Sequence, residues 1–183
     1  MEIMGRVPPV QFSHVGLFVR ELERMERFYT EFLGFVTSDR GNLAEARLVF
    51  LSRDPRDHHQ IVLVSGRPEA ARFSVVNQIS LRVEGLQALR YFRDNAARHG
   101  ASDVQPVSHG NAFSVYLRDP ELNRVELFMD TPWYVTQPLR EPLDLSLPDE
   151  ELWRRAEAQA RALPGFRPVA QWQREFAERL RQG

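Results

Sequence analysis

Two stretches decide the fold: FSHVGLFVRELERMERFYTEFLGF, residues 12–35, and VNQISLRVEGLQALRYFRDNAARHG, residues 76–100. A shift of 64 residues, the separation between His14 and Gln78, superimposes the second stretch on the first. Each begins with apolar residues at every second position and continues with a 3.6-residue period, which predicts a strand followed by a helix. The same shift aligns apolar residues in pairs, namely Leu17 with Leu81, Val19 with Val83, Leu22 with Leu86 and Phe28 with Phe92.

The repeat continues beyond these stretches, because each is followed by a similar turn motif and an apolar strand. The motifs are FLSRDP at 50–55 and YLRDP at 116–120, and the strands are IVLV at 61–64 and VELFM at 125–129. The pattern predicts two βαβββ modules, at about 12–66 and 76–130. We therefore expect an α+β fold in which the paired modules form one curved mixed sheet around a cavity.

The last part of the chain differs in composition from the repeat. Four prolines punctuate residues 130–148, which argues against regular structure there. Helix-start residues then predict one helix at about 148–162 and, after Pro164 and Gly165, a second at about 168–182. We expect a domain at 12–136, followed at 137–183 by a proline-rich linker and two helices. Three residues of the second helix have helical spacing and predict packing against the domain or a second chain: Trp172, Phe176 and Leu180.

Composition excludes several classes of function. The chain has 183 residues, 43% of them hydrophobic, and a formal net charge of −1, which disfavours nucleic acid and anionic membranes as partners. All 24 basic residues are arginine and cysteine is absent, which excludes lysine Schiff bases, thiolate metal sites and cysteine nucleophiles. The first residues, MEIMGRVPPVQF, do not resemble a signal peptide, so we expect a cytoplasmic protein.

Strand alternation indicates which side chains face the predicted cavity. If the apolar residues of each strand lie under the helices, then His14, Gln78 and Glu126 project from the opposite face. A histidine, an amide and a carboxylate on one concave face suggest a divalent metal site. Each also has a structural explanation, since His14 can be a hydrogen-bonded histidine and Glu126 can pair with Arg118 or Arg124.

Further polar residues can reach the same face. His58 and His59 precede the strand at 61–64, and alternation allows only one of them to face the cavity. His109 lies in a His-Gly-Asn turn, which is equally consistent with a surface turn. Tyr116 lies opposite the apolar side of its strand, so it faces either the cavity or the sheet rim.

With the repeat and these residues in place, the chain resembles the vicinal oxygen chelate superfamily. This group includes glyoxalase I, bleomycin-resistance proteins, fosfomycin-resistance enzymes and type I extradiol ring-cleaving dioxygenases. The resemblance covers about 12–136 and depends on HVGLFVRELERMERFYTEFLGF and RDPELNRVELF. It implies paired βαβββ modules but not a particular activity.

Within the superfamily the chain looks nearest to the extradiol dioxygenases. The resemblance implies a metal held by His14, Gln78 and Glu126, with Gln78 in place of a histidine ligand. It implies that His59 is an acid–base residue and that His109 and Tyr116 also act in catalysis. The metal implied is Fe(II), with Mn(II), Ni(II) or Zn(II) as alternatives, and the substrate is a small catecholic aromatic.

Two other functions follow from the same resemblance. Glyoxalases use a fourth ligand from the first module, and the corresponding position here, Ile61 or Val62, cannot bind metal. A non-oxidative metal-dependent lyase, isomerase or transferase remains an alternative to a dioxygenase. A non-catalytic protein that sequesters a ligand is the other, because Gln78 weakens the metal site. The family also implies a homodimer.

Overall fold

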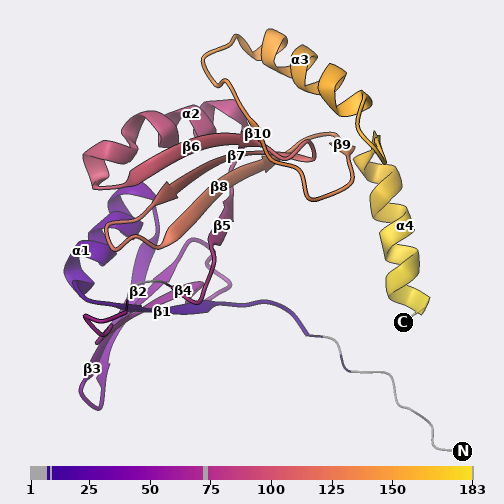
Figure 1. The fold of residues 1–183 in the computed structure, drawn as a ribbon. Helices are drawn as coiled ribbons and strands as arrows, with labels where there is room; N and C mark the ends of the chain where they lie inside the picture. The colour runs from indigo at the N-terminus through magenta and orange to yellow at the C-terminus, as the bar shows by residue number, and fades with distance from the viewer. Residues whose placement is uncertain (1–7, 9, 72–73, 183) are drawn as a thin grey trace, which may run out of the picture. The chain divides into compact units, whose positions relative to one another are not determined.

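The computed structural model describes residues 8, 10–71 and 74–182, and the chain forms two compact units, residues 1–71 and 72–183 (Figure 1). Each unit contains a strand, a helix and three further strands in that order, which confirms the predicted repeat and the α+β class. Residues 1–7 and 9, on which the expectation about a signal peptide depends, lie outside the described residues.

The first unit has a four-stranded mixed sheet with the strand order β1-β4-β3-β2. β1 runs parallel to β4, and the other pairs are antiparallel. Its elements are β1 (Val15–Val19), α1 (Leu22–Arg27), η1 (Phe28–Phe32), β2 (Val36–Leu43), β3 (Ala46–Ser52) and β4 (Ile61–Ser65).

Burial in the first unit follows the sequence periods. In β1, Leu17 and Val19 are buried while Phe18 between them is 64% exposed. The buried faces of α1 and η1 include Met25 and Phe28, and α1 contacts β3 and β4. The alternate side chains of β1 therefore lie on the sheet face opposite the helix.

The second unit has a five-stranded sheet with the strand order β10-β6-β7-β8-β5. β5 runs parallel to β8, and the other pairs are antiparallel. The helix α2 contacts β6, β7 and β8 and lies along one face of this sheet (Figure 1). The elements are β5 (Ile79–Arg82), α2 (Gly85–Asn95), η2 (Ala96–His99), β6 (Ser102–Ser108), β7 (Ala112–Arg118), β8 (Arg124–Asp130) and β10 (Glu141–Pro142).

A tight turn joins β7 to β8 and sets their register. The buried carboxylate of Asp119 accepts hydrogen bonds from the backbone N–H groups of Glu121 and Asn123 and from the Asn123 side chain. These bonds satisfy buried donors that the turn otherwise leaves unpaired. With this register Tyr116 lies directly opposite Glu126.

The C-terminal residues form the two predicted helices, α3 (Asp149–Arg161) and α4 (Val169–Gln182). Between β8 and α3 the chain has only the short strands β9 (Trp133–Tyr134) and β10, as its prolines predict. Trp133 and Val135 form a buried cluster with Ala160 of α3, and β11 (Arg167–Pro168) pairs with β9.

The predicted packing of α4 is confirmed for one end of its apolar row. The Trp172 ring stacks on Tyr134 of β9 at 5.2 Å between ring centroids. Phe176 stacks on Trp172 but is 39% exposed, and Leu180 is 62% exposed. None of the helices in the described residues has the length and apolar character to cross a membrane.

Candidate functional site

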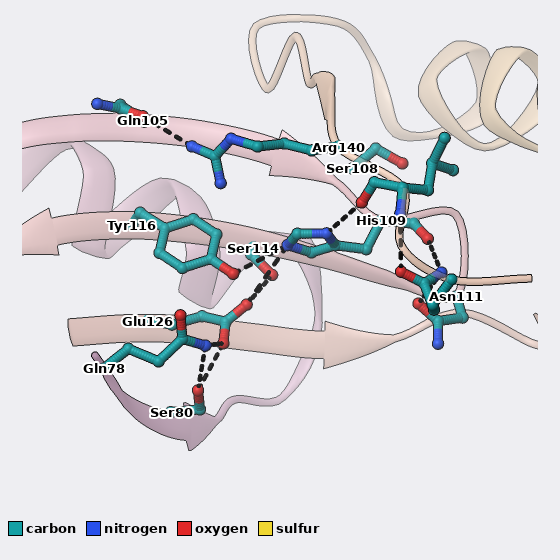
Figure 2. A network of polar contacts seen from close by, with 12 residues as sticks. Gln78, Ser80, Gln105, Ser108, His109, Asn111, Ser114, Tyr116, Glu126 and Arg140 are labelled. Atoms are coloured by element: carbon teal, nitrogen blue, oxygen red, sulfur yellow. Dashed lines mark hydrogen bonds and ion pairs between the residues drawn. The ribbon is translucent and has the colours of Figure 1, made fainter. Parts of the chain in front are cut away.

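The register of the second sheet brings a row of polar side chains together on one face. Glu126 in β8 is the register partner of Ser80 in β5 and of Tyr116 in β7. Gln78, just before β5, reaches the same carboxylate, as Figure 2 shows. Glu126 is only 7% exposed, so this row holds a buried acidic group.

Three side chains donate hydrogen bonds to the Glu126 carboxylate. Oε2 accepts from Nε2 of Gln78 at 2.8 Å and from Oγ of Ser80 at 2.5 Å, and Oε1 accepts from Oγ of Ser114 at 2.7 Å. Within the described ranges no arginine pairs with Glu126, and Arg118 lies 3.6 Å from Asp103 instead. The alternative in which Glu126 serves an arginine ion pair is therefore wrong, and neutral side chains donate to both of its oxygens.

His109 and Tyr116 extend this network. The Tyr116 hydroxyl lies 2.9 Å from Nε2 of His109, and the same nitrogen lies 3.7 Å from Oε1 of Glu126. Nδ1 of His109 lies 2.6 Å from the Leu139 carbonyl, which can only accept a hydrogen bond. In the neutral ring Nδ1 therefore carries the proton, and Nε2 accepts from the Tyr116 hydroxyl (Figure 2).

Burial raises the pKa of Tyr116 to about 12, and the nearby Glu126 carboxylate contributes to the rise. The phenol is therefore neutral at physiological pH, and its proton is the one that the hydroxyl donates to Nε2 of His109. His109, which the sequence allowed to be a surface turn, is instead part of the buried network.

In the first unit the structure brings His14 and His59 into contact. Their ring centroids lie 4.4 Å apart, and Nδ1 of His58 lies 2.9 Å from Nδ1 of His59. Burial lowers the pKa of His59, with smaller effects in the same direction from His14 and His58. Of the histidine doublet, His59 is the member that meets His14, while His58 has a side chain 57% exposed, 3.7 Å from Asp39.

The six predicted site residues thus fall into two groups. Gln78, Glu126, His109 and Tyr116 form one network in the second unit, and His14 contacts His59 in the first. The ligand set that joins His14 to Gln78 and Glu126 draws on both units and stays a prediction of the sequence.

The Gln78–Glu126 pair fits a divalent cation in residue type and proximity. The Gln78 side-chain amide already lies at Oε2 of the carboxylate, and rotation of the amide presents its oxygen, an acceptable metal ligand, in place of its N–H. Ser80 and Ser114 would then orient the carboxylate. Histidine and acidic residues alone do not form a three-ligand cluster anywhere in the described chain.

Sequence reasoning missed the residues that support the network from the C-terminal extension. Gln137 donates to the His109 carbonyl at 2.7 Å, and Leu139 binds the His109 ring. The guanidinium of Arg140 lies over the Tyr116 ring, 4.8 Å from its centroid. No periodicity marks these residues, because they lie in an irregular segment.

A sequence profile described as the Glyoxalase/Bleomycin resistance protein/Dioxygenase superfamily matches residues 11–127. No curated protein matches the chain.

Solved structures similar to this chain share its fold at low sequence identity. A glyoxylase/bleomycin resistance protein/dioxygenase domain from Frankia sp. EAN1pec is 22% identical with a TM-score of 0.58, over 68% of this chain and 100% of that one. The fosfomycin resistance protein FosX from Mesorhizobium loti is 22% identical with a TM-score of 0.52, over 66% and 92%. FosX from Listeria monocytogenes, complexed with Mn(II) and sulfate, is 16% identical with a TM-score of 0.53, over 68% and 95%.

Proposed function

Because the chain belongs to the glyoxalase/bleomycin resistance protein/dioxygenase superfamily, we propose that it is a metal-dependent dioxygenase of extradiol type acting on a small catecholic aromatic. The observation that supports this best is the hydrogen-bonded pair of His109 and Tyr116 beside the buried Glu126 carboxylate. That arrangement places a neutral phenol and an imidazole next to a carboxylate suited to a metal.

In this proposal Gln78 and Glu126 hold the metal, and His14 is the third ligand that the sequence predicts. The metal is Fe(II), which when bound supplies the redox chemistry toward dioxygen and the charge that acidifies a catechol hydroxyl. The FosX structure with Mn(II) supports a divalent metal, and Mn(II), Ni(II) and Zn(II) remain alternatives. Ser80 and Ser114 keep both carboxylate oxygens of Glu126 oriented.

The chain's own acids and bases then handle the protons. His59, whose pKa burial lowers, is neutral at pH 7 and accepts a proton from a substrate hydroxyl. Tyr116 stays protonated, and its hydroxyl turns from Nε2 of His109 to donate a hydrogen bond to a substrate oxygen when substrate binds. His109, with Nδ1 bound to the Leu139 carbonyl, presents Nε2 to the same region.

The test combines metal analysis with oxygen uptake on anaerobically purified protein. We expect about one iron per chain, lost in Glu126→Ala and reduced in Gln78→Ala, and oxygen uptake with a panel of catechols. If iron-loaded protein consumes no oxygen with any catechol, the dioxygenase proposal is wrong. A preference for Mn(II), Ni(II) or Zn(II) without oxygen uptake would favour a non-oxidative lyase, isomerase or transferase.

One observation favours a second candidate, a metal-free protein that sequesters an aromatic ligand. Both oxygens of Glu126 already accept hydrogen bonds from side chains, so the carboxylate is satisfied without a metal. Ligand binding that is unchanged by a chelator and by Glu126→Ala would support this candidate. Loss of binding in both conditions would exclude it.

The proposal also includes a cytoplasmic homodimer. The exposed apolar side chains of Phe176 and Leu180 on α4 support a contact with a second copy of the chain. Light scattering of the unmodified protein and of Leu180→Arg tests this contact. We expect a dimer for the unmodified protein and a weaker dimer for the variant, because the added charge lies in the apolar contact.

A further inference from the structure

We propose that Arg140 binds a carboxylate carried by the aromatic substrate, and that the C-terminal extension thereby selects anionic substrates. This inference rests on the proposed function, because it names the substrate class of the same site. Four observations support the inference. They are the position of the Arg140 guanidinium, the contacts that hold it, its lack of an acidic partner among the described residues, and its place outside the part of the chain that the superfamily profile matches.

The guanidinium lies beside the residues that would handle substrate. It covers the Tyr116 ring at 4.8 Å from the centroid, and the Tyr116 hydroxyl is bonded to His109 (Figure 2). Arg124 of β8 lies 5.8 Å from the same centroid, so a second positive charge faces this ring. A substrate whose carboxylate lies beside Tyr116 would contact the Arg140 guanidinium, while its aromatic ring would lie near Glu126.

Backbone pairing holds Arg140 in place. The next residue, Glu141, pairs with Ser108 in the β10–β6 ladder, and the preceding carbonyl of Leu139 binds the His109 ring. Nη2 of Arg140 donates to the side-chain oxygen of Gln105 at 2.7 Å. The segment is therefore ordered on both sides of Arg140, which reduces the entropy that ligand binding costs.

Arg140 has no acidic partner within the described residues, unlike many arginines of this chain. Arg90 pairs with Asp149, Arg82 with Asp130 and Arg118 with Asp103. The side-chain partners of Arg140 are a neutral amide and an aromatic ring, and the residue is exposed. Its remaining N–H donors are arranged to bind the two oxygens of a carboxylate.

The extension that carries Arg140 lies outside the part of the chain that the superfamily profile matches, residues 11–127. The shared fold supplies Tyr116 and Glu126, and the added segment supplies the cation. Selection by Arg140 is thus a property of this chain's own extension, and Arg140 can be substituted without removing any hydrogen-bond donor of Glu126.

The experiment compares two aromatic probes of similar shape, 3,4-dihydroxybenzoate and 4-methylcatechol, by anaerobic calorimetry on metal-loaded protein. We expect unmodified protein to bind the carboxylate more tightly. Arg140→Gln, which removes the charge but keeps a polar side chain, should weaken binding of the carboxylate about 10- to 100-fold and change that of 4-methylcatechol less than about 2-fold. Arg140→Lys should restore part of the loss, because it keeps the charge but not the fork.

The control is Arg155→Gln, which removes an exposed positive charge of α3 that pairs with Glu151. It should leave both affinities unchanged. Equal weakening of both probes by Arg140→Gln would indicate a merely structural arginine and overturn the proposal. Equal affinity of the unmodified protein for both probes would overturn it as well.

Failure of the dioxygenase proposal remains distinguishable from failure of this one. If binding is selective for the carboxylate and depends on Arg140 but no oxygen is consumed, the carboxylate site is supported and the dioxygenase proposal is contradicted. If the protein takes up no metal, benzoate and benzyl alcohol replace the catechols in the same comparison. Absence of Arg140-dependent benzoate binding would then overturn the carboxylate site.

Discussion

The two modules share one strand register, but the residues at equivalent positions are apolar in the first module and polar in the second. In each, three residues lie in a row across the first, last and third strands of the module, because the strands pair in the same way. The rows are Gly16, Val62 and Phe50 in the first sheet, and Ser80, Glu126 and Tyr116 in the second.

The difference teaches what a buried carboxylate needs. Glu126 has hydroxyl donors from Ser80 and Ser114, whereas the equivalent positions in the first sheet are Gly16 and Leu48, which offer no side-chain donor. A carboxylate at Val62 would therefore lack side-chain partners in its row. The same register also shows that Val62, rather than Ile61, occupies the place of a fourth ligand, so a four-ligand glyoxalase site is disfavoured.

Removing the acid of the second row should have the largest effect. Glu126→Ala should lower the affinity for Fe(II) or Mn(II) about 100-fold or more, because the proposed metal site loses a ligand and not only a supporting residue. Val62→Ala removes the equivalent residue of the first row and should leave the affinity unchanged. Competition with a fluorescent chelator measures both, and equal affinities in the two variants would contradict the assignment.

Placing an acid in the first row should destabilise the protein. Val62→Glu should lower the free energy of unfolding by about 1–3 kcal/mol at pH 7, since Val62 is only 7% exposed. Gly16→Ser, which has open space for a Cβ atom, supplies the missing hydroxyl and should recover part of that loss. Urea unfolding measures both variants, and Val62→Glu as stable as the unmodified protein would show that the donors of the second row are dispensable.

Removing the hydroxyl donors of Glu126 one at a time should show that they contribute unequally to metal affinity. Ser114 is fully buried, so Ser114→Ala should weaken metal binding about 10-fold through loss of carboxylate orientation. Ser80 is exposed, and water can replace its hydroxyl in Ser80→Ala, which should change the affinity less. Calorimetric metal titrations test this order, and the reverse order would contradict it.

The smallest effect concerns Tyr116, which faces Glu126 where the first row has Phe50 facing Val62. The folded-state pKa near 12 lies above the ordinary value near 10, so the folded protein keeps the proton while the unfolded chain loses it. Its contribution to stability is complete below pH 10 and disappears as the pH rises from about 10 to 12. Tyr116→Phe should lose less stability over that interval in urea unfolding, and identical losses would contradict the shifted pKa.

Local patterns predicted most of the fold. The two-residue period placed Leu17 and Val19 on the buried side of β1, and helical spacing with a helix-start signature located α3 and α4 within one or two residues. Such patterns depend on neighbours in the chain, so the sequence contains them without reference to the rest of the molecule.

Alternation also placed Gln78, Tyr116 and Glu126 on one face, where the structure joins them. It could not distinguish an ion pair with Arg118 from the amide and hydroxyl partners that Glu126 has, because donors 46 and 48 residues away meet it only through strand pairing. Nor could it choose between His58 and His59, whose orientation follows from the loop before β4.

The sequence alone determined two modules, their helices and the face on which the polar residues lie, since periodicity is a property of the local backbone. Only the tertiary structure decided that an irregular proline-rich segment returns to the second sheet, where Leu139 binds His109 and Arg140 covers Tyr116. That return depends on backbone pairing between β10 and β6, and backbone hydrogen bonds leave no signature in the order of side chains.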